Sequence, residues 1–187
     1  MAQALQQKNL HTETDYYNLP ENVRAELIEG QIYYQAAPSR IHQEILNYLN
    51  TEINIYIRSK DGMCRVYPAP FAVNLHQDEK NIVEPDISVI CDHNKLSEQG
   101  CNGAPDWIIE IVSPSSRSMD YYTKLSLYRS AGVTEYWIVD PMKQVVLVYD
   151  MEHAAAPVIY SFFDKIRVNI YNDLYINFSE INGLLNI

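Results

Sequence analysis

Glu110 is one of two acidic residues whose surroundings suggest chemistry. It is the single charged residue in an apolar run, Trp-Ile-Ile-Glu-Ile-Val at 107–112. A run of this kind between two prolines predicts a central strand that is buried on both faces. A buried carboxylate is costly unless it is paired or binds a metal. Asp86 stands in a similar run at 82–90. The two acids therefore predict a divalent-metal site, and the alternative is that each acid caps a turn or pairs with an arginine.

Lys124 stands where a charged residue is not expected. The sequence predicts a helix over 118–131, with Ser118 as its N-cap and Gly132 just past its end. At about 100° per residue, Lys124 falls within the apolar arc of this helix, and Asp120 lies beside it. One interpretation is an exposed Asp120–Lys124 pair or a lysine that snorkels at the helix border. The other is that Lys124 reaches over the strand ends to the two acids.

Two carboxylates and a lysine form a hydrolytic set. Carboxylate oxygens suit Mg²⁺, and Mn²⁺ is a second candidate. Such a metal polarises a phosphoryl oxygen and lowers the pKa of a bound water. The lysine can orient or deprotonate that water, or offset charge that develops in the transition state. Because Lys124 is placed at a helix border, we expect Lys124→Ala to remove cleavage and leave folding largely intact.

The elements that must position these residues follow from periodicity and turn signals. The expected helices are 14–18, 41–58 and 118–131. The expected strands are 31–35, 64–75, 82–91, 107–113, a hairpin of 135–139 with 145–149, and later strands at 158–163, 167–171 and 174–178. This order predicts an α/β fold in which helices flank a mixed sheet, with added strands at both ends.

The length of 187 residues fits one domain, which we place at 14–187 after a polar tail at 1–13. No apolar run approaches the ~20 residues of a membrane span, and the N-terminus lacks an apolar signal core. These features predict a cytoplasmic protein. Cys64, Cys91 and Cys101 are odd in number and lack CxxC spacing, which indicates neither a disulfide framework nor a zinc site.

The formal net charge of −10 argues against broad electrostatic capture of nucleic acid. Lysines and arginines are scattered along the chain. The nearest approach to a cluster is Arg58, Lys60 and Arg65, which is expected to be a solvated loop.

The chain resembles the putative restriction-endonuclease family within the PD-(D/E)XK nuclease superfamily. The resemblance covers roughly residues 14 to 150. Its motifs are Glu26-Leu-Ile-Glu29-Gly30, His42-Gln43, Pro85-Asp86, Glu110-Ile-Val-Ser113-Pro114, Asp120, Lys124, Ala131-Gly132-Val133 and Glu135-Tyr136-Trp137-Ile-Val-Asp140-Pro141. One departure is Val112, which stands two residues after Glu110, where the superfamily usually has its lysine. Lys124 would then be that lysine, moved to the following helix.

The resemblance implies a restriction-endonuclease-like core, Mg²⁺-dependent cleavage of phosphodiester bonds, DNA as the expected substrate, and a homodimer. It also implies that Glu29 is a third acidic group near the metal, although a plain turn carboxylate fits equally well. His42 is interpreted either as a structural histidine or as a hydrogen-bond partner of a ligand carboxylate or phosphate.

The sequence thus predicts a nuclease in which Asp86 and Glu110 bind the metal and Lys124 is catalytic, with Glu29 and His42 in support. The alternative is a non-enzymatic binding or assembly module that keeps the same fold. Hydrolysis of a small phosphoester is a third possibility, which suits the acidic surface better than duplex DNA does.

Overall fold

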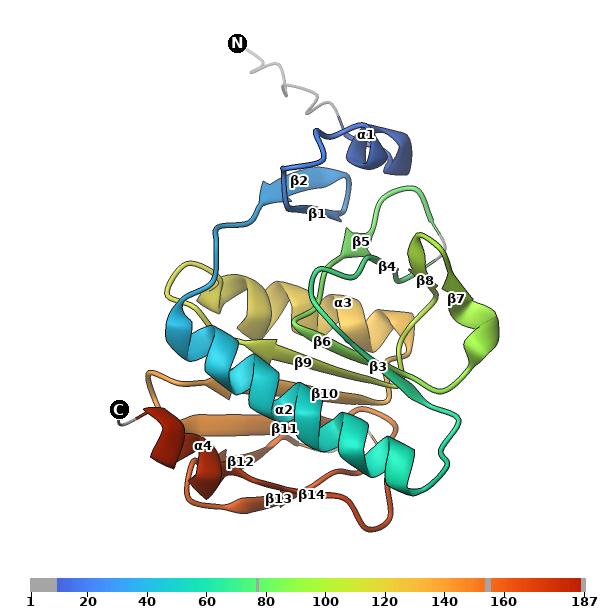
Figure 1. Ribbon diagram of the computed structural model, residues 1–187. Helices are drawn as coiled ribbons and strands as arrows, with labels where there is room; N and C mark the ends of the chain where they lie inside the picture. Colours follow the sequence, from blue (N-terminus) through green and yellow to red (C-terminus); the bar gives the residue numbers. More distant parts are fainter. Residues whose placement is uncertain (1–9, 77, 154–155, 186–187) are drawn as a thin grey trace.

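A computed structural model describes residues 10–76, 78–153 and 156–185. Its main sheet runs through the middle of the molecule (Figure 1) and has the strand order β12-β11-β10-β9-β6-β3. The strands are β3 (Arg65–Pro68), β6 (Ile87–Ile90), β9 (Trp107–Ile111), β10 (Glu135–Asp140), β11 (Val145–Asp150) and β12 (Val158–Ser161). Only β9 and β10 are parallel within this sheet. The predicted mixed sheet is therefore confirmed.

Strand β9 lies at the centre of the main sheet, with all five of its residues buried. It pairs with β10 on one side and with β6 on the other. Its first residue, Trp107, packs edge to face on Trp137 of β10, with 4.9 Å between ring centroids. The apolar run around Glu110 thus forms the buried central strand that the sequence predicted.

Helix α2 (Arg40–Ser59) covers one face of this sheet (Figure 1). It begins at the N-cap Ser39, whose side chain accepts a hydrogen bond from the His42 amide. Ile45, Leu49 and Ile53, four residues apart, are fully buried against the sheet. Each contributes about 1.5–3 kcal/mol to stability. The same core continues into the hairpin of β13 (Lys165–Arg167) and β14 (Tyr175–Asn177) and into α4 (Phe178–Leu185), a helix that the sequence did not predict.

Helix α3 (Lys124–Ala131) covers the opposite face and buries Leu127 and Tyr128. It follows a π-helical turn, η2 (Met119–Thr123), and ends before Gly132, which has φ 91°. The predicted cap was wrong, because Ser118 is already helical, with φ −65° and ψ −36°, and its side chain makes no capping hydrogen bond. Because of the π turn, the rotation is not 100° at every residue, as the sequence prediction had assumed. Lys124 is nevertheless buried on the side of the helix that faces the sheet.

A second sheet of short strands, order β2-β1-β5-β4-β8-β7, lies beside α3. Its strands are β1 (Ala25–Ile28), β2 (Gln31–Tyr34), β4 (Val73–Asn74), β5 (Ile82–Val83), β7 (Leu96–Ser97) and β8 (Gly100–Asn102). The predicted strands 64–75 and 82–91 are each split between the two sheets. The splits fall at the cis Ala69-Pro70 bond and at Pro85, because proline cannot donate to a strand ladder. The second split places Asp86 just before β6.

Cys64 and Cys91 form a disulfide, so the expectation drawn from cysteine spacing was wrong. The pair is set by sheet register: Arg65 of β3 faces Ile90 of β6, which brings the flanking cysteines together. Cys101 is free and buried.

The first helix, α1 (Glu13–Tyr17), lies one residue earlier than expected because Thr12 caps it through a capping box. Residues 1–9 of the predicted tail lie outside the described residues. A short 3-10 turn, η1 (His93–Lys95), precedes β7. Within the described ranges, no helix has the length and apolar character needed to cross a membrane.

Candidate active site

Asp86 and Glu110 meet because β6 and β9 are antiparallel. Ile87 of β6 pairs with Ile109 of β9, so the residue before Ile87 lies beside the residue after Ile109. The Ile111 amide donates to Asp86 Oδ2 at 2.7 Å, and the Asp86 amide lies 3.4 Å from Glu110 Oε2. The structure therefore brings together the two acids that were expected to share a site.

Lys124 joins this pair from α3. Its Nζ lies 2.9 Å from Glu110 Oε1 and 4.0 Å from Asp120 Oδ1, and the residue is only 4% exposed. Tyr128, one turn further along α3, donates its hydroxyl hydrogen to the same Glu110 oxygen at 2.5 Å. Of the two interpretations of Lys124, the structure supports the one in which it reaches the acids, and it is not a solvated lysine.

Glu26 is the acidic neighbour that sequence reasoning missed. It is buried in β1, and its Oε1 lies 2.8 Å from Lys124 Nζ. The same oxygen accepts a hydrogen bond from the Glu84 amide at 2.9 Å. The signal that could have found it is the one that marked Glu110, a single acid within a short apolar strand.

Glu29 does not join the cluster, which corrects the expectation for that residue. It is exposed in the turn after β1, with φ 50°, and its amide donates to Asn81 Oδ1 at 3.0 Å. Both glutamates belong to the same motif, but only Glu26 stands within the strand. A strand that enters the core carries its own side chains into it, whereas the turn that follows faces solvent.

His42 supports Asp86 from the first turn of α2. Its Nε2 lies 3.1 Å from Asp86 Oδ2, and a carboxylate can only accept, so this nitrogen carries the hydrogen. Among the described residues, its buried Nδ1 has no hydrogen-bond partner. The geometry matches the interpretation of His42 as a partner of a ligand carboxylate.

Burial and mutual repulsion control the charges of the cluster. Burial raises the pKa of Glu110 well above its usual range; Lys124 opposes this effect and the neighbouring acids add to it. Burial likewise raises the pKa of Asp120 to about 6. For Lys124, burial alone would lower the pKa, but Glu110, Glu26 and Asp120 outweigh it and raise the pKa well above the ordinary value. Lys124 is therefore an ammonium ion at neutral pH.

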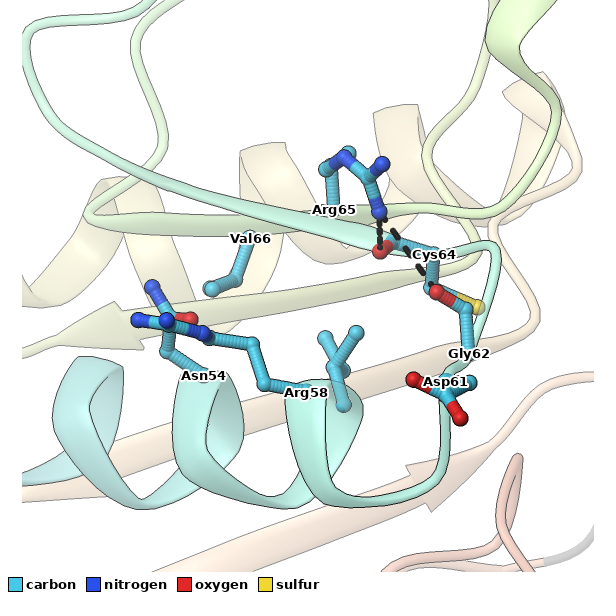
Figure 2. Close-up of a pocket in the computed structure, with 8 residues that line it drawn as sticks. Asn54, Arg58, Asp61, Gly62, Cys64, Arg65 and Val66 are labelled. Atoms are coloured by element: carbon cyan, nitrogen blue, oxygen red, sulfur yellow. Dashed lines mark hydrogen bonds between the residues drawn. The ribbon is translucent and has the colours of Figure 1, made fainter.

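A cavity of about 750 Å³ opens onto these residues. Its floor holds the acids and the lysine, and its walls come from the end of β2, the start of α2 and the loop after β9. The charged residues that line it are Arg24, Glu26, Glu84, Asp86, Glu110, Asp120 and Lys124, and His42 lines it as well. A second cavity of about 670 Å³ lies at the other end of α2, around Arg58 and Arg65, and contains none of these residues (Figure 2).

Two oxygens of the cluster remain suited to a cation. Asp86 Oδ2 and Glu110 Oε1 carry the short hydrogen bonds, which leaves Asp86 Oδ1 and Glu110 Oε2. Within the described part of the chain, no group of three or more His, Cys, Asp or Glu residues is arranged to hold a metal. Two carboxylates still fit Mg²⁺, because this ion usually keeps several waters and takes substrate phosphate oxygens as further ligands.

Comparison with known proteins agrees with this fold. The crystal structure of a putative nuclease belonging to DUF820 from Anabaena variabilis ATCC 29413 superposes with a TM-score of 0.76 at 23% identity, over 93% of this chain and 98% of that one. At that identity the likeness shows the fold alone. A search of curated proteins finds no match. The Uma2 family model, described as a putative restriction endonuclease, matches residues 14–174. Because this match spans most of the sequence, the chain belongs to the Uma2 family of putative restriction endonucleases.

Proposed function

We propose that the protein hydrolyses phosphodiester bonds in nucleic acid, with Mg²⁺ held by Asp86 and Glu110 and with Lys124 as the catalytic cation. This proposal rests on one observation: the carboxylates of Asp86 and Glu110 lie next to each other and beside the buried ammonium group of Lys124, and all three line one open cavity. The family model and the fold of the DUF820 protein support a nuclease. DNA as substrate, Mn²⁺ as a substitute for Mg²⁺ and the homodimer stay predictions.

Each side chain of the cluster has a distinct part in this proposal. Bound Mg²⁺ would supply Lewis acidity at the scissile phosphate and at the attacking water. The Ile111 amide and His42 fix the orientation of Asp86, and Tyr128 fixes that of Glu110. These contacts hold both acids in place before a substrate arrives, which lowers the reorganisation needed in the transition state.

The charge of Lys124 favours one of its possible roles. A lysine whose pKa lies well above its ordinary value does not take a proton from water near neutral pH. Its ammonium group can instead donate a hydrogen bond to a phosphate oxygen or to the attacking water and offset the negative charge that develops there. We therefore propose Lys124 as an orienting and charge-stabilising residue.

The binding-module alternative rests on two observations. Lys124 already has two carboxylate partners within 2.9 Å, and the chain carries a formal charge of −10. A buried ion cluster whose members are all paired can serve the fold alone, because removing any one partner leaves an uncompensated charge. The enzyme proposal accounts in addition for the open cavity above the cluster.

The test is metal-dependent cleavage of single- and double-stranded DNA and RNA by the wild type and by Asp86→Asn, Glu110→Gln and Lys124→Ala. Glu29→Gln is the matched control, because it makes the same acid-to-amide change outside the cavity. We expect Mg²⁺- or Mn²⁺-dependent cleavage that the three site variants lose and the control keeps. If the wild type cleaves no nucleic acid, and a protein partner binds the three site variants as well as it binds the wild type, the binding-module alternative is correct.

A further inference from the structure

The rim of the cavity above the acids is apolar and partly aromatic. Tyr34, at the end of the edge strand β2, lines the cavity and is 71% exposed. Met142, which follows β10, lines it as well and is 55% exposed. Other apolar lining residues include Tyr33, Ala36, Ala37, Pro38, Ile41 and Pro114. Large apolar side chains left open to solvent around a cavity mark a surface for binding.

The cations around the cavity are already engaged. Lys124 is held by the buried acids. The remaining basic residues that line or directly flank the cavity also have partners: Arg24 pairs with Glu84, Arg40 with Glu44 and Arg117 with Asp140, and Lys143 lies over the Tyr121 ring. A strand that entered here would find few free cations to neutralise its phosphates.

The nearest group of basic residues lies elsewhere. Arg58 is twelve residues after Leu46, the last residue of α2 that lines the cavity, which places it about 18 Å further along the helix at 1.5 Å per residue. Figure 2 shows the Arg65 guanidinium turned back toward main-chain oxygens, with the Cys64 carbonyl 3.0 Å away. Lys60 is paired with Asp173 at 2.6 Å. This region therefore offers no continuous basic track to the acids.

We infer that the cavity binds one unpaired nucleotide through its base, stacked on Tyr34 against the apolar rim, so that the substrate is single-stranded or locally unpaired nucleic acid. This inference rests on the proposed nuclease function. Duplex binding depends mainly on phosphate neutralisation, which an acidic chain with engaged cations provides poorly. Base stacking on an aromatic ring contributes about 1–3 kcal/mol per base in addition to phosphate contacts, and it tolerates any base because every base has a π-face. A volume of about 750 Å³ lies in the range of cavities that enclose small ligands.

The experiment compares three labelled substrates: oligothymidylate, a blunt duplex, and the same duplex with an unpaired flap. Cleavage is measured in Mg²⁺, and binding of each substrate is measured by fluorescence anisotropy in Ca²⁺. We expect cleavage of the oligothymidylate and of the flap at least about tenfold more efficiently than cleavage of the duplex. Tyr34→Ala should raise KM and Kd for the unpaired substrates about tenfold, with kcat little changed. Tyr34→Phe keeps the ring and should restore wild-type values.

Phe163→Ala is the matched control, because Phe163 is 70% exposed and lies outside the cavity lining. It should match the wild type in every assay. Equal or better cleavage of the blunt duplex, or a Tyr34→Ala variant with unchanged KM and Kd, overturns the inference and leaves the nuclease proposal standing. If oligothymidylate binds in a Tyr34-dependent way but no substrate is cleaved, the nuclease proposal fails and the binding site stands.

Discussion

Lys124 of α3 and Glu26 of β1 form a buried ion pair, with 2.8 Å between Nζ and Oε1. The two residues belong to different layers, because β1 lies in the second sheet and α3 packs on the main sheet. The same ammonium group also contacts Glu110 in the centre of the main sheet. The lysine therefore connects the two sheets at the floor of the cavity, and its loss affects the fold as well as the chemistry.

Lys124→Met should destabilise the protein by about 3–5 kcal/mol at pH 7.5, because it leaves buried acids without their cation. This replaces the expectation that truncating the lysine would leave folding intact. Urea unfolding measures the change, and the loss should shrink at pH 5.5, below the pKa of about 6 at which Asp120 takes up a proton. Lys165→Met, at an exposed lysine, should be nearly neutral. If the Lys124→Met protein is as stable as the wild type at both pH values, Lys124 does not compensate the charge of the buried acids.

Glu26→Gln should lower kcat about tenfold and leave KM nearly unchanged. The amide oxygen can still accept hydrogen bonds from Lys124 and from the Glu84 amide, but the charge that orients the ammonium group is gone. Steady-state kinetics on the substrate found by the cleavage screen measure both constants. Glu29→Gln should behave as the wild type. A reversed result, with activity lost only in Glu29→Gln, would restore the assignment made from the sequence.

The sequence predicted the core of the site because that information is local. A lone acid within a β-branched run indicates a buried carboxylate, and this held for Glu110. Asp86 lies just before β6 and is only partly buried, but strand pairing brings it beside Glu110. Lys124 was found because a lysine on the apolar arc of a helix has to be satisfied by partners. In each case the departure from a regular pattern marked the residue.

Features that depend on strand register were not predictable in the same way. The disulfide between Cys64 and Cys91 follows from the pairing of β3 with β6, which the sequence does not state. The choice between Glu26 and Glu29 depended on where β1 ends, and strand boundaries are set by tertiary contacts as much as by propensity. The π turn before Lys124 likewise has no clear sequence signal.

Without divalent cations, the stability of the wild type should rise as the pH falls from 7.5 to about 5.5. The pKa of Asp120 is raised to about 6, so the folded state binds its proton more tightly than the unfolded state does. A group with a raised carboxyl pKa destabilises the fold when it is ionised, and this cost is relieved as the pH drops through the folded-state value. The gain over this pH range should be about 0.8 kcal/mol, measured by urea unfolding in EDTA.

Asp120→Asn should reduce that pH dependence, because the amide does not titrate and removes the contribution of Asp120. Asp164→Asn is the control: the hydrogen bonds that Ser161 donates lower the pKa of this exposed carboxyl, so its removal should leave the rise toward pH 5.5 in place. If the stability of the wild type falls steadily from pH 7.5 to 5.5, the pKa of Asp120 is not raised in the folded state.

Mg²⁺ should stabilise the folded protein by mass action if Asp86 and Glu110 hold it. At a concentration one hundred times Kd, the gain is about 2.7 kcal/mol, and EDTA should reverse it. Thermal melts with and without Mg²⁺ measure the effect. Asp86→Asn keeps an acceptor for the Ile111 amide but removes the charge, so it should lose the response. Glu29→Gln should keep it, and a response that Asp86→Asn retains would place the cation elsewhere.

His42→Ala should weaken Mg²⁺ binding about tenfold, because Asp86 loses the hydrogen bond from Nε2 that orients its carboxylate. The expected kinetic signature is a raised Mg²⁺ requirement, with activity largely recovered at saturating Mg²⁺. His153→Ala is the matched control, since His153 also contacts an aspartate, Asp150, but its side chain is 72% exposed. Titrations of activity and of melting temperature against Mg²⁺ measure the two variants together. If His42→Ala and His153→Ala both show the wild-type Mg²⁺ dependence, His42 is a structural residue and Asp86 is oriented by the Ile111 amide alone.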